Sequence, residues 1–385
     1  MLIPGITKGR FVKLQKFDVN GIAVAFTGDH QELLDLIVRE LSLFAGTGEN
    51  PAVIFNITKQ RLAPDKPSSS KDGVFVGEAA FIKIHKHLRQ FFIKIHGNPF
   101  STQAVNIDVS CEGKYGSSTT LGKIREYPFR VLYSNYFSRL ENLAQDFISV
   151  AFRGIMLLVM LQKQGAFLHA SAVEKDGEAT LFAGSGGTGK TSCCVRLVDE
   201  SNYRFLSDDM TLINSNGIVC LYPKYINCFP YNLRWSDNLR SQGVESRPLF
   251  DKMHYKARSA LGLRALRLVS PEKIWGWGKL GDRGHVSKVI HLVQGRSSSF
   301  EVKPAKSADL ARENAQIFTE EFVDVLEILA NWHLLDPSIP DAAGVTEEVQ
   351  KIYERAFSKA VCFIVSVPYH ASFERSFGFV RQLVG

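Results

Sequence analysis

Short apolar runs alternate with polar stretches through the first part of the chain. Residues 21–26 and 52–57 are apolar runs of strand length, and the apolar periodicity of residues 31–44 between them is typical of a helix. Residues 81–85 and 92–96 both read FIKIH, in which apolar and polar positions alternate as in a half-buried strand. We therefore expect an α+β fold here, with the two repeats as strands of an antiparallel sheet.

Each FIKIH repeat ends on a histidine, His85 in the first and His96 in the second. A pair of histidines can hold a metal, but no cysteine or carboxylate cluster accompanies these two in the sequence. We interpret both as exposed residues at strand ends.

Apolar positions become denser along residues 135–164, which predict a long helix packed between two domains. Its residues 154–161, GIMLLVML, are the most hydrophobic run of the chain, but eight residues are too few to span a bilayer. We expect this run to be buried and predict no membrane association. The domain boundary is placed at the end of the helix, with an N-terminal α+β domain over residues 1–165 and a second domain over residues 166–385.

Strand patterns and helix patterns alternate through the second domain. Strands are expected at residues 167–173, 178–183, 203–206, 210–214, 217–222, 287–293 and 361–367. Helices are expected after residue 190 and over residues 319–335 and 346–360, the last with Thr346 as its N-cap. This alternation predicts an α/β fold.

A phosphate-binding pattern lies between the strand at 178–183 and the helix that follows it. Residues 184–191 read GSGGTGKT and match G-x-x-x-x-G-K-[ST] at every fixed position. Its glycines let the backbone turn tightly, so that N–H groups can face phosphate oxygens, and the helix dipole adds positive potential. The candidate nucleotide-binding residues are Gly184, Ser185, Gly186, Gly187, Thr188, Gly189, Lys190, Thr191 and Ser192. In this pattern Lys190 supplies charge to the outer phosphates and Thr191 supplies a hydroxyl to Mg²⁺.

The residues after the loop fit a helix that packs on a sheet. Cys193, Cys194, Leu197 and Val198 repeat at one-and-four spacing and form one apolar face. Strand, loop and helix therefore follow in the order that a nucleotide loop requires. The alternative is a glycine-rich turn without a ligand.

Two adjacent carboxylates, Asp208 and Asp209, end the strand predicted at residues 203–206. Metal-assisted phosphoryl transfer requires one acid near the metal and one near the attacking hydroxyl. The pair is therefore a candidate for this chemistry, and a solvated turn is the alternative.

Positive charge is concentrated downstream of these acids. The chain has 385 residues and a net charge of +7, with the apolar content of an ordinary globular protein. Residues 221–290 contain thirteen Lys and Arg against five Asp and Glu, or +8, so the remainder is close to neutral. This stretch could receive an acidic or anionic partner, bind nucleic acid, or form a solvated basic face. Aromatic residues are interleaved there without a nucleotide-stacking signature, which makes nucleic acid the less favoured partner.

The cysteines indicate neither a metal site nor a disulfide framework. They are Cys111, Cys193, Cys194, Cys220, Cys228 and Cys362, without metal-ligand spacing. The first residues, MLIPGITKGRFVKL, contain no apolar signal core. We therefore expect a cytoplasmic protein.

Several of these segments together resemble the kinase domain of HPr kinase/phosphorylase, and especially the HprK-related kinases of bacterial gene clusters. The segments are LHASAV at 168–173, the turn at 174–177, the loop at 184–191 and LSDD at 206–209. The resemblance covers residues 166–230 well, is faint beyond them and is absent before residue 164. It implies a mixed central sheet related to the nucleotide domain of phosphoenolpyruvate carboxykinase.

The resemblance also implies roles for single residues. His169 matches the active-site histidine of the family, Lys190 its phosphate-binding lysine and Thr191 its magnesium-binding hydroxyl. Asp209 matches the acid that takes the proton from the substrate hydroxyl, with Asp208 beside it at the metal. On chemistry alone, His169 would be interpreted as a hydrogen-bonded core histidine.

The sequence departs from the family pattern after the aspartates. The family places a second magnesium-binding carboxylate there, but residues 221–234 contain no acid. Either Asp208 completes the metal site or the metal is held more loosely. The loop on which phosphorylase activity depends is not found, so that activity is not predicted.

These observations predict an ATP- and Mg²⁺-dependent kinase that phosphorylates a hydroxyl of a protein serine or a small molecule. A nucleotide-dependent switch or ATPase without an acceptor is the alternative. The sequence does not identify the acceptor, fix ATP as the donor or set the oligomeric state, which could be a homo-oligomer.

Overall fold

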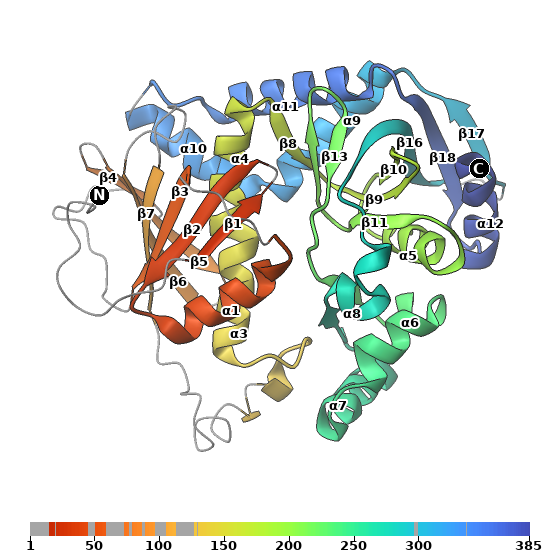
Figure 1. The fold of residues 1–385 in the computed structure, drawn as a ribbon, viewed down its shortest axis with the longest axis horizontal. Helices are drawn as coiled ribbons and strands as arrows, with labels where there is room; N and C mark the ends of the chain where they lie inside the picture. The colour runs from red at the N-terminus through yellow and green to blue at the C-terminus, as the bar shows by residue number, and fades with distance from the viewer. Residues whose placement is uncertain are drawn as a thin grey trace. The chain divides into compact units, whose positions relative to one another are not determined.

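The computed structural model describes residues 15–19, 21–44, 51–58, 73–76, 79–86, 89–96, 105–112, 127–128, 130–295, 299–335 and 337–385 (Figure 1). The chain divides into two compact units, Met1–Lys114 with Leu143–Gln145, and Tyr115–Asn142 with Asp146–Gly385. They are named here the N-terminal unit and the C-terminal unit. The predicted domain ranges 1–165 and 166–385 stay a prediction.

A seven-stranded mixed sheet forms the N-terminal unit, in the order β1-β2-β3-β7-β6-β5-β4. The strands are β1 Gln15–Val19, β2 Ile22–Gly28, β3 Val53–Thr58, β4 Gly73–Val76, β5 Ala79–Lys86, β6 Arg89–His96 and β7 Val105–Glu112. The helix α1 Gln31–Leu41 buries its apolar stripe, and the short turn η1 Ser42–Phe44 follows it. The predicted strands of this region and the helix between the first two are confirmed.

The two FIKIH repeats pair with each other in the antiparallel direction as β5 and β6, with Ile82 opposite Ile93. His96 lies 2.8 Å from the carboxylate of Asp108 on β7, and 41% of its side chain is exposed. The side chain of His85 lies outside the described residues. Within the described part of the chain no group of three or more His, Cys, Asp and Glu side chains is arranged to hold a metal.

A nine-stranded mixed sheet forms the core of the C-terminal unit. Its main path is β11-β9-β10-β16-β13-β12-β8, and β18 joins β16 to β17. Central β10 and β18 both run parallel to β16, and the other neighbours are antiparallel. The strands are β8 Gly165–Leu168, β9 Ala170–Lys175, β10 Glu178–Ala183, β11 Arg204–Ser207, β12 Thr211–Asn214, β13 Ile218–Cys220, β16 Arg283–Gly295, β17 Glu301–Pro304 and β18 Val361–Pro368, with a separate pair β14 Ile226–Cys228 and β15 Arg267–Val269.

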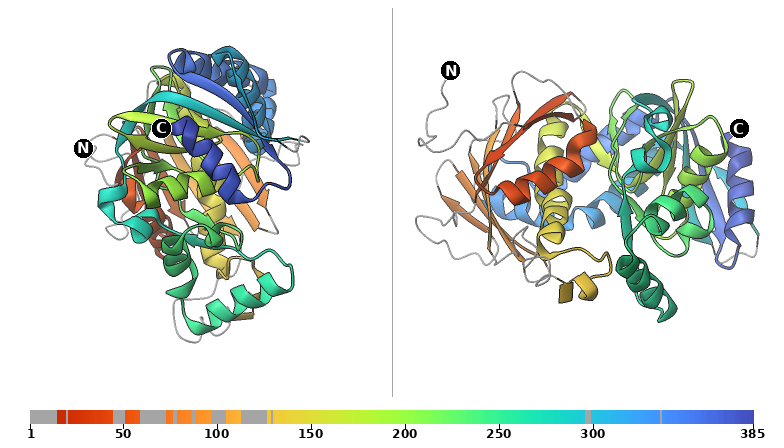
Figure 2. Two further views of the ribbon diagram at one scale, coloured as in Figure 1. Left: turned by 90° about the vertical axis from the view of Figure 1, so that its right-hand side faces the viewer. Right: turned by 60° about the horizontal axis from the view of Figure 1, so that its bottom comes forward.

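Helices cover both faces of this sheet, with α5 on one face and α9 and α11 on the other (Figures 1 and 2). The helices from residue 139 onward are α3 Arg139–Asp146, η2 Phe147–Phe152, α4 Arg153–Gln162, α5 Lys190–Glu200, η3 Asn232–Arg234, α6 Asp237–Arg240, η4 Ser241–Glu245, α7 Leu249–Ala260, α8 Pro271–Trp275, η5 Trp277–Lys279, α9 Ser307–Glu321, α10 Val323–Leu335, α11 Ala342–Phe357 and α12 Phe373–Val384. The predicted apolar face of α5 is buried at Cys193, Cys194, Leu197 and Val198. The chain thus has the predicted α/β class with a mixed central sheet.

Two helix predictions are corrected. The helix predicted at 319–335 is the end of α9 followed by α10, and most of α9 was not predicted. Thr346 is not the N-cap of α11, because Asp341 accepts the backbone N–H of Gly344 at 2.7 Å and starts that helix earlier. Asp at an N-cap satisfies an otherwise unpaired helical N–H, whereas the Thr346 hydroxyl donates back to the carbonyl of Ala342.

The long helix predicted at 135–164 runs as α3, η2 and α4 from Arg139 to Gln162. By length and composition alone it could cross a membrane, and no other helix in the described residues passes that test. Of its most apolar window 72% is buried inside the protein, as in the core helix of a soluble protein. The prediction that residues 154–161 are buried is confirmed.

Candidate functional site

The loop between β10 and α5 has a backbone that glycine makes possible. Gly184, Gly187 and Gly189 have φ values of +121°, +80° and +95°, which side chains rarely adopt. A Cβ on Gly184 would lie 2.2 Å from the carbonyl oxygen of Leu292 on β16. The loop therefore leaves β10 pressed against the neighbouring strand and opens α5 through Gly189.

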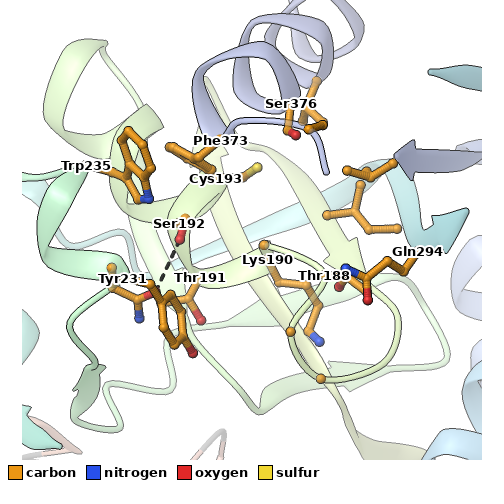
Figure 3. Close-up of a pocket in the computed structure, with 18 of the residues that line it drawn as sticks. Thr188, Lys190, Thr191, Ser192, Cys193, Tyr231, Trp235, Gln294, Phe373 and Ser376 are labelled. Atoms are coloured by element: carbon orange, nitrogen blue, oxygen red, sulfur yellow. Dashed lines mark hydrogen bonds between the residues drawn. The ribbon is translucent and has the colours of Figure 1, made fainter. Parts of the chain in front are cut away.

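Lys190 starts α5 and turns its side chain back under the loop (Figure 3). Its Nζ donates hydrogen bonds of 2.7 Å to the carbonyl oxygens of Gly184 and Ser185. Burial lowers the pKa of this ammonium, and the charges of Asp208 and Asp209 oppose that shift. The loop thus encloses one buried positive charge below the N–H groups that begin α5.

Asp208 is buried beside hydroxyl groups. It is 2% exposed, and its Oδ1 accepts hydrogen bonds from Ser171 at 2.6 Å and Thr191 at 2.8 Å. Burial raises the pKa of its carboxyl, although the two hydroxyls act in the opposite direction. Among the described residues, no Lys, Arg or His forms an ion pair with it. A buried carboxylate of this kind is a good ligand for a cation.

Asp209, directly after Asp208, occupies a strained turn. Its φ is +68°, and Met210 N–H donates to the carbonyl of Asp208 at 2.8 Å, so Asp209 is the centre of a γ-turn. Its carboxylate forms an ion pair with Lys224. Burial raises its pKa, but Lys224, His169 and Arg153 outweigh burial and bring the pKa to about 2. Strain of this kind is often retained where it positions a functional group.

His169 lies at the break between β8 and β9, where a single strand was predicted. The two strands have different partners, because β8 pairs with β12 while β9 pairs with β10 and β11. The buried Nδ1 of His169 has no hydrogen-bond partner among the described residues and lies 3.9 Å from Asp209 Oδ1 and 3.7 Å from Glu321 Oε1. Burial and the charge of Lys190 lower the pKa of His169 to about 4, so the ring is neutral at pH 7.

Lys224, Arg153 and Glu321 lie around His169 and Asp209 and were not predicted from the sequence. Lys224 reaches Asp209 because Tyr222 N–H bonds the carbonyl of Leu206 and aligns that segment with the end of β11. Arg153 donates to the Glu321 carbonyl at 2.9 Å, and its charge lowers the pKa of both His169 and Asp209. Only Arg153, a charge at the start of the most apolar run, carried a sequence signal.

These residues surround one end of a pocket of about 430 Å³. The loop from Gly186 to Ser192, His169 and Asp209 line it, and two further groups of residues close it. One group is Asn227, Phe229, Tyr231, Asn232 and Trp235, and the other is Leu292, Gln294, Val367, Pro368, Tyr369, Ala371, Phe373, Ser376 and Val380. Figure 3 shows Tyr231 and Trp235 on one side of Ser192 and Thr191, and Gln294 next to Thr188 on the other. The pocket therefore extends on both sides of the helix start.

The sequence candidates are divided between this pocket and the layer beneath it. Gly186, Gly187, Thr188, Gly189, Lys190, Thr191, Ser192, His169 and Asp209 line the pocket. The carbonyl oxygens of Gly184 and Ser185 accept hydrogen bonds from Lys190, and Asp208 accepts one from Thr191. Their individual roles stay predictions.

The oxygen donors present fit a magnesium ion. Mg²⁺ prefers one or two carboxylates and completes its shell with water and substrate phosphate oxygens. Asp208 and the Thr191 hydroxyl lie side by side, and Asp208 lacks an ion-pair partner among the described residues. The remaining ligands would have to come from phosphate and water.

The predicted basic stretch is not a uniform solvated face. Arg267 is fully buried, where it binds Asp251 and donates to the carbonyl of Ser134 at 2.9 Å. Lys224 neutralises Asp209, and Lys279 donates to the carbonyls of Val198 and Ser201. Part of the positive charge is therefore used inside the fold.

The mixed sheet, in which a glycine-rich loop connects β10 to α5, defines an α/β protein. The family model of the SynChlorMet cassette protein ScmC matches residues 142–225, which include the loop and both acids. Among solved structures, the Hpr(Ser) kinase/phosphatase from Coxiella burnetii matches with 14% identity over 36% of this chain and 77% of that chain, with a TM-score of 0.23. No curated protein matches. A TM-score this low does not show a shared activity, so the function has to be argued from the site itself.

Proposed function

We propose that this protein is an ATP- and Mg²⁺-dependent kinase that transfers a phosphoryl group to a hydroxyl, either of a protein serine or of a small molecule. The observation that carries this proposal is that Asp208 and Asp209, although adjacent in sequence, have different surroundings. One acid bonds the hydroxyl that follows the loop lysine, and the γ-turn directs the other to the pocket beside His169.

The loop supports binding of the donor. Its N–H groups and the start of α5 favour an anion, and Lys190 adds a positive charge at the same place. Asp208 and Thr191 would hold Mg²⁺, which when bound neutralises charge on the phosphate oxygens. Transfer requires Lys190 to exchange a carbonyl hydrogen bond for a phosphate oxygen.

Asp209 is suited to orient the acceptor hydroxyl and accept its proton. The side chain is ionised at neutral pH because Lys224 and His169 hold its pKa at about 2, even though burial acts in the opposite direction. A carboxylate of such low pKa is a weak base. It is nonetheless sufficient if the bond between the γ-phosphorus and the leaving ADP breaks early, as in the loose transition state of phosphoryl transfer.

The same low pKa favours a second candidate, a nucleotide hydrolase that acts as a switch and has no acceptor. In that case Asp209 would orient water, as the water-positioning residues of nucleotide switches do. The two candidates differ in product, because a kinase yields ADP together with a phosphorylated acceptor and a hydrolase yields ADP with free phosphate.

The test is transfer from γ-labelled ATP in the presence of Mg²⁺ to proteins and metabolites of a lysate. Asp209→Asn is expected to lower the rate of transfer by about 10²- to 10⁴-fold, the usual range for a lost proton acceptor. Asp208→Asn is expected instead to raise the Mg²⁺ concentration that gives half-maximal rate. Asp237→Asn is the matched control, because that side chain is 89% exposed.

Three results would contradict the proposal. Transfer by Asp209→Asn at the wild-type rate would show that the base is wrongly assigned. Label found only in free phosphate would support the hydrolase. Failure of the wild-type protein to bind ATP at all would remove both candidates.

A further inference from the structure

Helix α7, Leu249–Ala260, has its amphipathic pattern reversed. The positions of the helix and its following turn that face solvent are Leu249, Phe250, Met253, Lys256, Ala257, Ala260 and Leu261. Their spacing follows the helical period, and all but Lys256 are apolar. The exposed fractions of Leu249, Phe250, Met253 and Leu261 are 64%, 64%, 56% and 74%. A surface helix normally turns such a stripe to the core.

The polar side of α7 is the side that packs on the protein. Asp251 is buried against Arg267, and the Tyr255 hydroxyl donates to the carbonyl of Cys228 at 3.2 Å. His254 bonds both Arg267 and the carbonyl of Val131 at 2.9 Å. These bonds fix the rotation of the helix, so its apolar stripe is held in solvent.

Neighbouring segments enlarge the apolar area. Leu263, after the helix, is 50% exposed, and Val131 and Leu132 are 41% and 72% exposed. The rings of Tyr127 and Phe250 lie 6.3 Å apart. Contiguous apolar surface of this kind on a folded protein usually marks an interaction site. In the right-hand view of Figure 2, α7 extends away from the sheet of its unit.

The charge around this area indicates the sign of the charge on its partner. Residues 247–267 contain six Lys and Arg and one acid, Asp251, which is buried against Arg267. Lys256 and Arg264 are exposed at the edge of the stripe. A second copy of the chain paired by a two-fold axis would bring like charges together, which disfavours that occupant. A partner with both apolar and acidic side chains complements the stripe through the former and its positively charged edge through the latter.

Contacts connect the segment that follows α7 to the pocket. The guanidinium of Arg264 lies 5.6 Å from the centre of the Phe229 ring, and Phe229 stacks on Tyr231 at 5.3 Å. Both rings line the pocket that contains Asp209. A chain bound along α7 and past Arg264 would therefore lead to the candidate phosphoryl-transfer site. This continuity favours a protein over a membrane, since a lipid surface could not enter the pocket.

We propose that the α7 surface, formed by Leu249, Phe250, Met253, Leu261 and Leu263 with Lys256 and Arg264 at its edge, docks an acidic amphipathic segment of a protein acceptor. The proposal rests on the proposed kinase function and makes it more specific, because it selects a protein as the acceptor.

Docking is tested first without nucleotide. The probe is a fluorescein-labelled helical peptide of about five turns, ~18 residues, made of Leu, Glu and one Ser with Leu along one face. Its control has Lys at every Glu position. The wild-type protein is expected to bind the Glu peptide at least ~10-fold more tightly than the Lys peptide in fluorescence anisotropy, because only the former complements the charge.

Three variants make the test specific. The triple variant Phe250→Ser, Met253→Ser, Leu261→Ser is expected to bind the Glu peptide about 10-fold or more weakly than the wild-type protein, because apolar contacts are lost. Lys256→Glu with Arg264→Glu should reverse the preference between the two peptides. The control is Val323→Ser with Leu334→Ser, which changes apolar side chains that are 57% and 80% exposed elsewhere and should leave binding unaltered. Circular dichroism checks that each variant is folded.

A second arm connects docking to the reaction. With MgATP, the triple variant should raise the KM for phosphorylation of the peptide serine and leave kcat unaltered, since docking contributes equally to ground and transition states. If the peptide binds but is not phosphorylated, the result would support the α7 docking surface and contradict the proposed kinase function. If the triple variant phosphorylates the peptide with an unaltered KM, the result would support the proposed kinase function and contradict the α7 docking surface.

Three other results would overturn this inference. The first is equal binding of both peptides by the wild-type protein. The second is co-sedimentation with vesicles of phosphatidylglycerol and phosphatidylcholine that the triple variant loses, which would assign the surface to a membrane. The third is a wild-type dimer in sedimentation velocity that the triple variant loses, which would assign it to a second copy.

Discussion

The two walls of the pocket are built in opposite ways. The loop wall, residues 184–192, is continuous in sequence, and its groups bond mostly to one another. The facing wall brings His169, Asp209 and Tyr231 together from separate strands and turns, and Lys224 forms an ion pair with Asp209. The loop is therefore a local device that a motif can identify. The facing wall depends on strand pairing, so its charges can be altered one by one without altering the loop.

The greatest loss of stability is expected from a substitution that the backbone of the loop wall cannot accommodate. Gly184→Ala should lower the free energy of unfolding by about 3 kcal/mol or more, because the new Cβ meets the Leu292 carbonyl and φ is unfavourable for alanine. Gly186→Ala is the matched control, since no described residue lies within 4 Å of the Cβ that alanine would add there. Urea denaturation measures both. Equal stability of the two variants would show that the loop does not press on β16.

The second effect concerns His169 in the facing wall. Burial lowers its pKa to about 4 in the folded protein, so between pH 6.5 and pH 4 the unfolded state binds more protons. Stability must fall as pH falls through this window, and His169→Gln should reduce that loss by up to about 3 kcal/mol. Urea denaturation at a series of pH values measures the slope.

Two other histidines sharpen this measurement. His291 is buried with a pKa of about 4 and keeps part of the acid sensitivity in the variant. His370 is exposed, so His370→Gln should leave the slope as in the wild-type protein. A slope unaltered by His169→Gln would mean that the ring is not held neutral by the fold.

A smaller effect is expected from a change in the ion-pair partner of Asp209, which alters the pKa of that carboxyl group. Lys224→Gln removes the main cause that lowers the pKa of Asp209, so that pKa must rise. The acid limb of the rate of phosphoryl transfer should therefore move to higher pH, with less than about a 10-fold change in rate at pH 7.5. Exposed Lys273 provides the control variant Lys273→Gln. An acid limb that stays in place would show that Asp209 is not the group that titrates.

Features that depend on neighbours along the chain could be predicted from the amino-acid sequence. The loop at 184–191, the buried face of α5, the antiparallel FIKIH strands and the hairpin of β12 and β13 follow from residue type and period alone. The N-cap of α11 was missed because Asp341 and Thr346 are both competent caps, and only the position where the chain turns selects between them.

The surroundings of the two aspartates depend on the three-dimensional fold and could not be predicted. Nothing in the order of residues shows that the strand at 167–173 divides at His169, since the division results from pairing with different strands. Nor does it show that Lys224, Arg153 and Glu321 approach Asp209 and His169, or that α7 turns its apolar side to solvent. These depend on contacts between residues far apart in the chain, which govern burial, pKa and exposure and leave no periodic pattern in the sequence.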